Sequence, residues 1–210
     1  MSNAINNKTN KLMIVTGVWL VLSLIGTVVL VAYSNSAGAQ DHEARDLPDS
    51  LAAEMTPGRH TLLMFVHPKC PCSRSSLSEL ARLMMSCAKQ VDARVYFFQP
   101  AGQPDDWSHT DLWNSAARIP GVSVARDVDG QHALSMQAET SGQVFLFDPQ
   151  RKMVFRGGIT AGRGHEGDNY GRTAVENIVL HNHAERSMTP VFGCTILEIP
   201  SGDHCEGPAK

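Results

Sequence analysis

The sequence predicts one α/β domain, a mixed sheet flanked by helices, preceded by a single N-terminal transmembrane helix. Three observations lead to this prediction. Residues 12–33 carry no charge and are strongly apolar, and an apolar strand at 61–67 runs through a cysteine-containing turn into an amphipathic helix. Strand and helix patterns then alternate along the chain. The 210 residues leave room for one domain of ordinary size besides the apolar segment.

The apolar segment decides the compartment. A helix over residues 12–33 spans the ~30 Å hydrocarbon core of a membrane. Lys8 and Lys11 precede it, whereas acidic residues dominate after it, so residues 1–11 are predicted to be cytoplasmic and the domain periplasmic or otherwise extracytoplasmic. We expect a single-pass protein of the inner membrane. Ala37-Gly38-Ala39 matches the small-residue pattern of a signal-peptidase site, so cleavage is the alternative to a retained anchor.

Charge and composition narrow the function classes. Hydrophobic residues make up 42% of the chain and charged residues 19%, which is too apolar for a disordered protein. The formal net charge is −3, although Lys8 and Lys11 are the only charged side chains before residue 34, so the exported part is more acidic still. A nucleic-acid partner is therefore not expected.

Residues 34–57 lack a sustained apolar period and predict a linker. The domain itself is expected at 58–186. Residues 187–210 then form a C-terminal tail that contains two cysteines.

Each element of the domain has its own signal. The continuous apolar run 61–67 is typical of a strand buried on both faces. Beyond Pro68 the apolar residues recur with a helical period from Leu77 to Ala88. The later elements are a strand at 94–99, a crossover helix at 105–117, a hairpin of 143–148 with 152–156, and a last helix at 172–183.

Cys70-Pro71-Cys72 lies where the first strand becomes the first helix. A helix start offers unpaired N–H groups and a partial positive charge, which stabilise a thiolate, and Lys69 and Arg74 add to this effect. Pro71 disfavours helical geometry at Cys70, so Cys70 should lie just outside the helix and Cys72 within it. Cys70 is therefore the predicted nucleophile. A disulfide between such close cysteines is strained and easily reduced.

The order of elements resembles the thioredoxin-like superfamily over about residues 58–186, and in detail the RedB-like group of membrane-tethered proteins. The motifs that carry the closer likeness are His67-Pro68-Lys69-Cys70-Pro71-Cys72-Ser73, Thr140-Ser141-Gly142, Gly157-Gly158-Ile159-Thr160, Arg163-Gly164-His165, Gly167-Asp168-Asn169 and Phe192-Gly193-Cys194. The resemblance implies a periplasmic thiol-disulfide role with Cys70 and Cys72 as the redox pair.

The chain departs from the thioredoxin pattern at two places. One residue, not two, separates the cysteines, and the loop that usually carries a cis-proline reads Thr140-Ser141-Gly142. We expect this loop to face the cysteines, with the Thr140 and Ser141 hydroxyls available to donate hydrogen bonds to a thiolate.

The other cysteines and two histidines leave alternatives open. Cys87 lies on the apolar face of its helix and is interpreted as a small buried hydrophobe. Cys194 either pairs with Cys205 in an oxidising compartment, resolves a disulfide with Cys70, or adds a third soft metal ligand. His67 and His165 are either structural or serve as proton donors or metal ligands beside the cysteines. Within the glycine-rich stretch 157–171, Asp168 and Asn169 are expected to cap the last helix.

Two functions follow. The first is a membrane-anchored thiol-disulfide oxidoreductase without a cofactor: Cys70 attacks a protein disulfide, Cys72 resolves the mixed disulfide, and a redox partner restores the starting state. The alternative is a copper- or zinc-binding metallochaperone module that uses Cys70 and Cys72 with His67 or His165.

Overall fold

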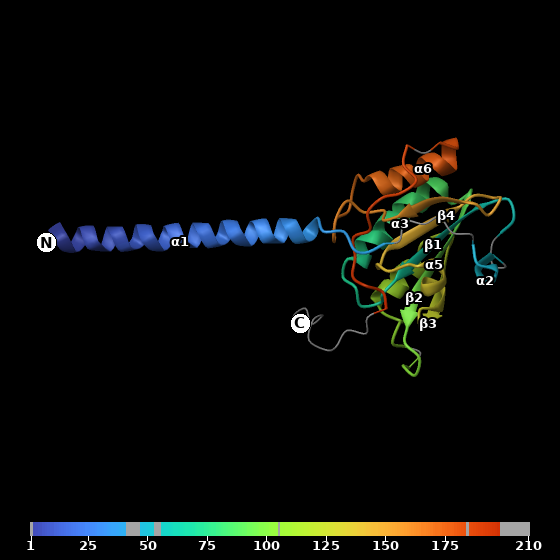
Figure 1. Ribbon diagram of the computed structural model, residues 1–210, viewed down its shortest axis with the longest axis horizontal. Coiled ribbons are helices and arrows are strands. Elements are labelled where there is room, and N and C mark those ends of the chain that lie inside the picture. Colours follow the sequence, from blue (N-terminus) through green and yellow to red (C-terminus); the bar gives the residue numbers. More distant parts are fainter. Residues whose placement is uncertain (1, 41–46, 53–55, 105, 184, 198–210) are drawn as a thin grey trace. The chain divides into compact units, whose positions relative to one another are not determined.

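The computed structural model describes residues 2–40, 47–52, 56–104, 106–183 and 185–197 of the chain. It divides into two compact units, Met1–Ser36 and Ala37–Lys210. The first unit holds helix α1 (Ser2–Ser34), drawn in blue in Figure 1. Within α1, Asn10–Ser34 is the single stretch among the described residues that is long and apolar enough to cross a membrane, which confirms the predicted apolar N-terminal helix.

The second unit is built on a five-stranded mixed sheet in the order β3-β2-β1-β4-β5 (Figure 1). Strands β1, β2 and β3 are parallel to one another, while β4 pairs antiparallel with both β1 and β5. The strands are β1 (His60–Val66), β2 (Val91–Gln99), β3 (Val122–Val128), β4 (Gln143–Phe147) and β5 (Met153–Gly157). Every residue of β1 and β4 is buried, which explains why these strands appear as continuous apolar runs in the sequence.

Helices cover the two faces of the sheet. One face packs against α3 (Ser73–Cys87), α4 (Asp111–Ala117) and α6 (Tyr170–His181). The other face packs against α5 (Gln131–Met136) and Leu51 of α2 (Asp49–Ala52). Alternate residues of β1 point into the two cores, as a pleated strand requires. This arrangement confirms the predicted α/β class, and the fold is thioredoxin-like.

Several elements differ from the prediction, among them the short helix α2, which lies within the predicted linker 34–57. Strand β3 and helix α5 were not predicted: β3 is a partly exposed edge strand that contains Arg126 and Asp127, and α5 has only 6 residues. Helix α4 begins at Asp111 rather than 105, because the Pro104 and Asp106 carbonyls accept turn hydrogen bonds instead and Thr110 has extended backbone geometry, with φ −79° and ψ −178°. Residue 105 itself lies outside the described residues.

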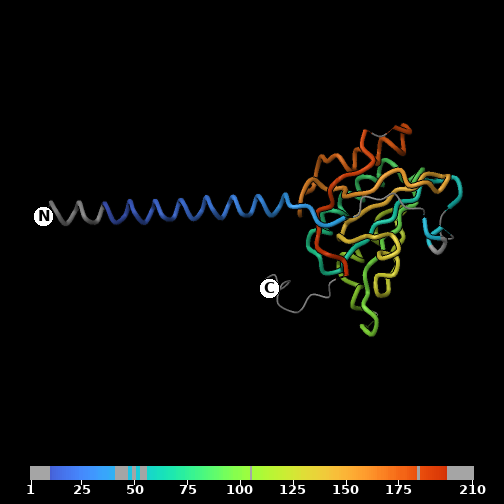
Figure 2. The backbone as a smooth tube through the Cα atoms, viewed as in Figure 1, coloured from blue at the N-terminus to red at the C-terminus, as the bar shows by residue number. Residues whose placement is uncertain are grey.

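Described residues on either side of the region 58–186 pack beside it. Gly38 N–H donates to the Val191 carbonyl at 2.8 Å, so residues 37–40 lie beside the C-terminal segment, coloured red in Figure 2. Val191 and Ile196 are buried, and Ile196 joins the core that α5 covers. Described parts of the predicted linker 34–57 and tail 187–210 therefore contribute to the packing of the domain.

Candidate functional site

The cysteine turn connects β1 to α3, as the sequence predicts. Ser73 N–H donates to the Cys70 carbonyl at 3.1 Å, and Cys70 N–H donates to the His67 carbonyl at 3.1 Å. Cys72 is the N-cap of α3, which places it one residue earlier than the position predicted within the helix. Cys70 is only 1% exposed, whereas Cys72 is partly exposed. The predicted nucleophile is thus covered, and its neighbour lies at the surface.

The cover over Cys70 comes from the C-terminal strap, residues 187–197. The Cys194 Sγ lies 3.0 Å from the Cys70 Sγ, and Cys194 N–H is directed at the same sulfur at 3.4 Å. The structure records the four described cysteines as free thiols. The strap therefore brings a third thiol to the turn that carries Cys70 and Cys72. Cys205, the other predicted partner of Cys194, lies outside the described residues.

Hydrogen bonds concentrate the negative charge on Cys70. Those from the Cys194 and Cys72 thiols, the Ser73 hydroxyl and Cys194 N–H lower the pKa of Cys70 far below its ordinary value, although burial opposes this shift. The pKa of Cys194 is raised, mainly by the hydrogen bond of its thiol to Cys70 and, to a smaller extent, by its hydrogen bond with Cys72. Cys194 lowers the pKa of Cys72, but Cys70 and burial together raise it more. These shifts favour the thiolate form at Cys70 over Cys72 and Cys194.

Two serines support that thiolate. Ser141 Oγ accepts the His67 N–H at 2.8 Å and lies 2.7 Å from Ser73 Oγ. Because Ser141 accepts from the backbone, its own proton can go to Ser73, and the Ser73 proton can go to Cys70. The sequence predicted direct hydrogen bonds from Thr140 and Ser141 to the thiolate. In the structure Ser141 acts through Ser73, and Thr140 Oγ1 donates instead to the Ala39 carbonyl at 2.6 Å.

The nearby positive charges are arranged differently from the prediction. Lys69 Nζ lies 4.6 Å from the centroid of the Trp107 ring, in a cation–π contact. Arg74 forms an ion pair with Asp111 of α4, so a carboxylate offsets its charge. Arg163 is the cation that acts on the thiols, which the sequence did not predict. Its guanidinium donates to the Gly193 carbonyl at 2.6 Å, and its charge lowers the pKa of Cys72. Its only sequence signal is its place in the glycine-rich motif.

The two candidate histidines have different surroundings. His67 is 3% exposed, its Nδ1 accepts the Lys69 N–H at 3.2 Å, and its ring packs against Phe98 and Trp107. Burial lowers the pKa of His67, which keeps the ring neutral. Its Nε2 is buried and has no hydrogen-bond partner among the described residues. His165 is exposed, and its Nδ1 lies 3.0 Å from the Arg163 carbonyl.

A copper or zinc site needs several ligands that converge. Within the ranges that the structure describes, no group of three or more His, Cys, Asp and Glu side chains is arranged to hold a metal ion. The three thiols supply soft donors, but the described structure adds no histidine to them as a further ligand.

The glycine-rich stretch is fixed by a buried carboxylate. Glu79 of α3 is fully buried, accepts the Gly167 N–H at 2.7 Å and pairs with Arg172 Nε at 2.8 Å. Asn169 Oδ1 accepts the Arg172 N–H at 2.7 Å and caps α6, as predicted, whereas Asp168 is exposed and lies 3.6 Å from the Arg172 guanidinium. This network holds the loop that carries Arg163.

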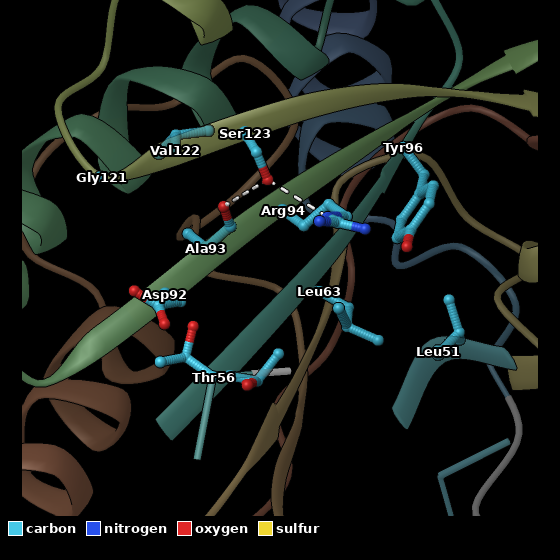
Figure 3. A pocket seen from close by; sticks show the side chains of 11 residues that line it. Leu51, Thr56, Leu63, Asp92, Ala93, Arg94, Tyr96, Gly121, Val122 and Ser123 are labelled. Carbon is cyan, nitrogen blue, oxygen red and sulfur yellow. Dashed lines mark hydrogen bonds between the residues drawn. The ribbon is translucent and has the colours of Figure 1, made fainter. Parts of the chain in front are cut away.

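A cavity of about 300 Å³ lies elsewhere on the sheet. Its lining includes Asp92 and Arg94 near the start of β2 and Val122 and Ser123 at the start of β3 (Figure 3). Cys70 follows the end of β1, and β1, β2 and β3 are parallel, so the cavity and the thiols lie toward opposite ends of these strands. The cavity is separate from the thiol cluster.

Two solved structures with TM-scores above 0.5 agree with the fold, and a third is more distantly similar. A hypothetical protein from Sinorhizobium meliloti 1021 is similar with a TM-score of 0.58 at 20% identity, over 77% of this chain and 94% of that chain. An uncharacterized conserved protein from Geobacillus kaustophilus is similar with a TM-score of 0.58 at 20% identity, over 80% of this chain and 94% of that chain. StoA from Bacillus subtilis has a TM-score of 0.42 at 13% identity, over 58% of this chain and 83% of that chain.

At the level of sequence, no family model matches this chain, and the search of curated proteins gives no match. The chain has a thioredoxin-like domain, and its narrower likeness to the RedB-like group stays a prediction.

Proposed function

We propose that this chain is a membrane-anchored, extracytoplasmic thiol-disulfide oxidoreductase with Cys70 as its nucleophile. The observation that carries the proposal is the cluster of thiols in which Cys194 Sγ lies 3.0 Å from Cys70 Sγ at the start of α3. A thiolate is the reactive form in disulfide exchange, and hydrogen bonds from Cys194, Cys72 and Ser73 stabilise it at Cys70.

The reaction needs no cofactor. The Cys70 thiolate attacks one sulfur of a substrate disulfide, so a Cys70–substrate disulfide forms, the substrate S–S bond breaks and the departing sulfur takes up a proton. A second cysteine of the chain then attacks Cys70, which releases the remaining substrate thiol. Two electrons pass from the protein to the substrate. A dithiol of a redox partner returns the protein to its starting state, and each step also runs in reverse.

The second cysteine is either Cys72 or Cys194. The sequence favours Cys72, which is two residues away, but a disulfide across so short a ring is strained. The structure favours Cys194, whose sulfur already lies 3.0 Å from Cys70 and needs only a short movement to reach bonding distance.

The extracytoplasmic location rests on the N-terminal segment. The apolar span Asn10–Ser34 can serve as an anchor or as a signal, and Lys8 and Lys11 at its N-terminal side favour a cytoplasmic N-terminus. An oxidising compartment suits a protein whose chemistry is disulfide exchange.

The test is disulfide exchange by the full chain in detergent micelles. The protein is equilibrated in glutathione redox buffers, quenched with acid and mapped by mass spectrometry. We expect an intramolecular disulfide at Cys70 and rapid exchange that Cys70→Ser abolishes. Cys87→Ser is the matched control, because Cys87 is fully buried on α3, and it should exchange like the original chain. A Cys70→Ser protein that exchanges normally contradicts the proposal.

A copper- or zinc-binding module is the second candidate, and the close approach of two soft sulfur donors favours it. Bound metal and free thiols are measured together on the same purified full chain. Stoichiometric metal with all cysteines reduced supports the metallochaperone function. A metal-free protein with a reducible disulfide supports the oxidoreductase.

A further inference from the structure

The strap pairs with the Thr140 loop as a short antiparallel strand. Thr140 and Thr195 form an antiparallel bridge, flanked by two backbone hydrogen bonds. Ser141 N–H donates to the Cys194 carbonyl at 2.7 Å, and Ile196 N–H donates to the Glu139 carbonyl at 2.9 Å. These bonds use only main-chain groups of the strap. The edge at residues 139–141 can therefore bind any extended chain whose amide and carbonyl groups lie in the same register.

This pairing determines which side chain meets Cys70. The residue before the bridged Thr195 is Cys194, and its sulfur lies 3.0 Å from Cys70 Sγ while its N–H is directed at the same sulfur. A cysteine at this position of a paired chain is thus delivered to the thiolate by backbone geometry alone. The edge at 139–141 and Cys70 together hold an extended segment that contains cysteine, which here is the strap itself.

The strap fills that site and excludes other chains. Cys70 is 1% exposed with the strap in place, and Gly193 passes so close to Ser141 that a Cβ on Gly193 would collide with the Ser141 carbonyl oxygen. Further bonds secure the strap: Gly38 N–H donates to the Val191 carbonyl at 2.8 Å, and Arg163 donates to the Gly193 carbonyl at 2.6 Å. A protein substrate cannot reach Cys70 until residues 193–196 leave the edge.

We propose that residues 193–196 are a built-in occupant of the substrate-docking edge, which an extended cysteine-containing segment of a protein disulfide must displace to react with Cys70. This inference rests on the proposed oxidoreductase function. It adds the class of substrate and the way in which the strap regulates access to Cys70. The substrate segment pairs with residues 139–141 as the strap does, and its second residue after the reacting cysteine must supply the N–H that Ile196 now donates to Glu139.

The departure and return of the strap also set the order of the reaction steps. Cys70 thiolate attacks the docked substrate sulfur, a Cys70–substrate disulfide forms, and the departing substrate sulfur takes up a proton. When the strap returns to the edge, the Cys194 thiol loses its proton and attacks Cys70. The Cys70–Cys194 disulfide forms, the second substrate thiol leaves, and the substrate has gained two electrons. The same movement thus resolves the mixed disulfide and displaces the product.

The test compares two variants of the full chain, both of which lack the Cys194 sulfur. Cys194→Ser keeps the strap on the edge, whereas a chain that ends at Gly193 removes its pairing residues. Each is mixed with a peptide of the sequence of residues 191–197 whose cysteine is activated as a pyridyl disulfide, and pyridinethione release is followed. Two backbone hydrogen bonds compete with the peptide, so the truncated chain should react about tenfold faster than Cys194→Ser.

Two further measurements guard against a folding artefact. Gly193→Ala keeps every strap residue except for one added methyl group, and it should react with the peptide faster than the original chain while its circular dichroism is unchanged. A peptide with proline at the position of Ile196 lacks the N–H for Glu139. It should therefore react with the truncated chain no faster than with Cys194→Ser.

The outcomes separate the two proposals. Equal peptide rates in Cys194→Ser and the truncated chain, or no loss with the proline peptide, overturn the strap inference while the oxidoreductase function stands. A small pyridyl disulfide needs no docking edge. If Cys70 reacts neither with it nor with any other disulfide in any of these proteins, both proposals are overturned.

Discussion

The hydroxyl oxygens of Ser73 and Ser141 lie 2.7 Å apart, and both residues are buried where α3 meets the loop before β4. Ser141 also accepts the His67 N–H from the end of β1, so one loop residue connects a strand, a helix and the reactive sulfur. The loop that lacks a proline thereby contributes a polar link to Cys70. Its effect on the thiolate passes through Ser73.

Ser73→Ala should raise the pKa of Cys70. The substitution removes one hydrogen bond to a thiolate, which is worth about 1.5–3 kcal/mol, or roughly one to two pKa units. The pH dependence of Cys70 alkylation, read by mass spectrometry, measures the shift. Ser78→Ala on the same helix is the control and should leave the profile in place. An unchanged profile in Ser73→Ala means that the hydroxyl does not reach the sulfur.

Glu79→Ala should destabilise the domain by about 3–5 kcal/mol, because it leaves Arg172 without its buried partner and removes the acceptor for Gly167 N–H. Glu176→Ala is the matched control: Glu176 also pairs with Arg172, at 3.1 Å, but lies on the partly exposed side, and the expected cost is below about 1 kcal/mol. Urea unfolding followed by circular dichroism compares the two. Similar midpoints for both variants would contradict the assigned role of Glu79.

Stability should fall as the pH falls below about 6.5, the ordinary pKa of histidine. Burial lowers the pKa of His67 in the folded protein, with Cys70 opposing and Lys69 assisting the shift, so the unfolded chain binds a proton that the folded chain excludes. His67→Gln should flatten the decline in unfolding free energy between about pH 7 and pH 5, whereas exposed His181→Gln should not. An identical slope in His67→Gln contradicts the prediction.

Cys87 should resist alkylation until the protein unfolds. It is fully buried, and burial raises the pKa of its thiol to about 11. Native protein treated with iodoacetamide near neutral pH should keep Cys87 unmodified, and the same treatment in urea should modify it. Rapid native labelling of Cys87 would show that α3 opens far more readily than its packing indicates.

Protease added to intact spheroplasts should digest the chain beyond about residue 34, because Lys8 and Lys11 favour a cytoplasmic N-terminus. A fragment that contains the N-terminal helix should remain with the membrane. Complete protection of the domain until detergent is added places it on the cytoplasmic side and refutes the predicted topology.

Local patterns made much of the domain predictable. The charge-free segment 12–33, the buried strand β1, the thiol turn and the hairpin of β4 and β5 each depend on neighbouring residues, whose apolar period and turn residues are visible in the sequence. Strand β3 escaped prediction because an edge strand buries little, and α5 because it is shorter than two turns of helix.

The sequence by itself determined that Cys70 and Cys72 stand at a helix start, where an adjacent strand, a proline and a helical period fix the geometry locally. Only the tertiary structure decided that Cys194, 124 residues away along the chain, lies 3.0 Å from Cys70. It also placed Ser73 between Ser141 and the sulfur, and Arg163 at Gly193. The physical reason is that these contacts depend on how distant segments pair and pack, and no local period records which backbone edge a distant segment will occupy.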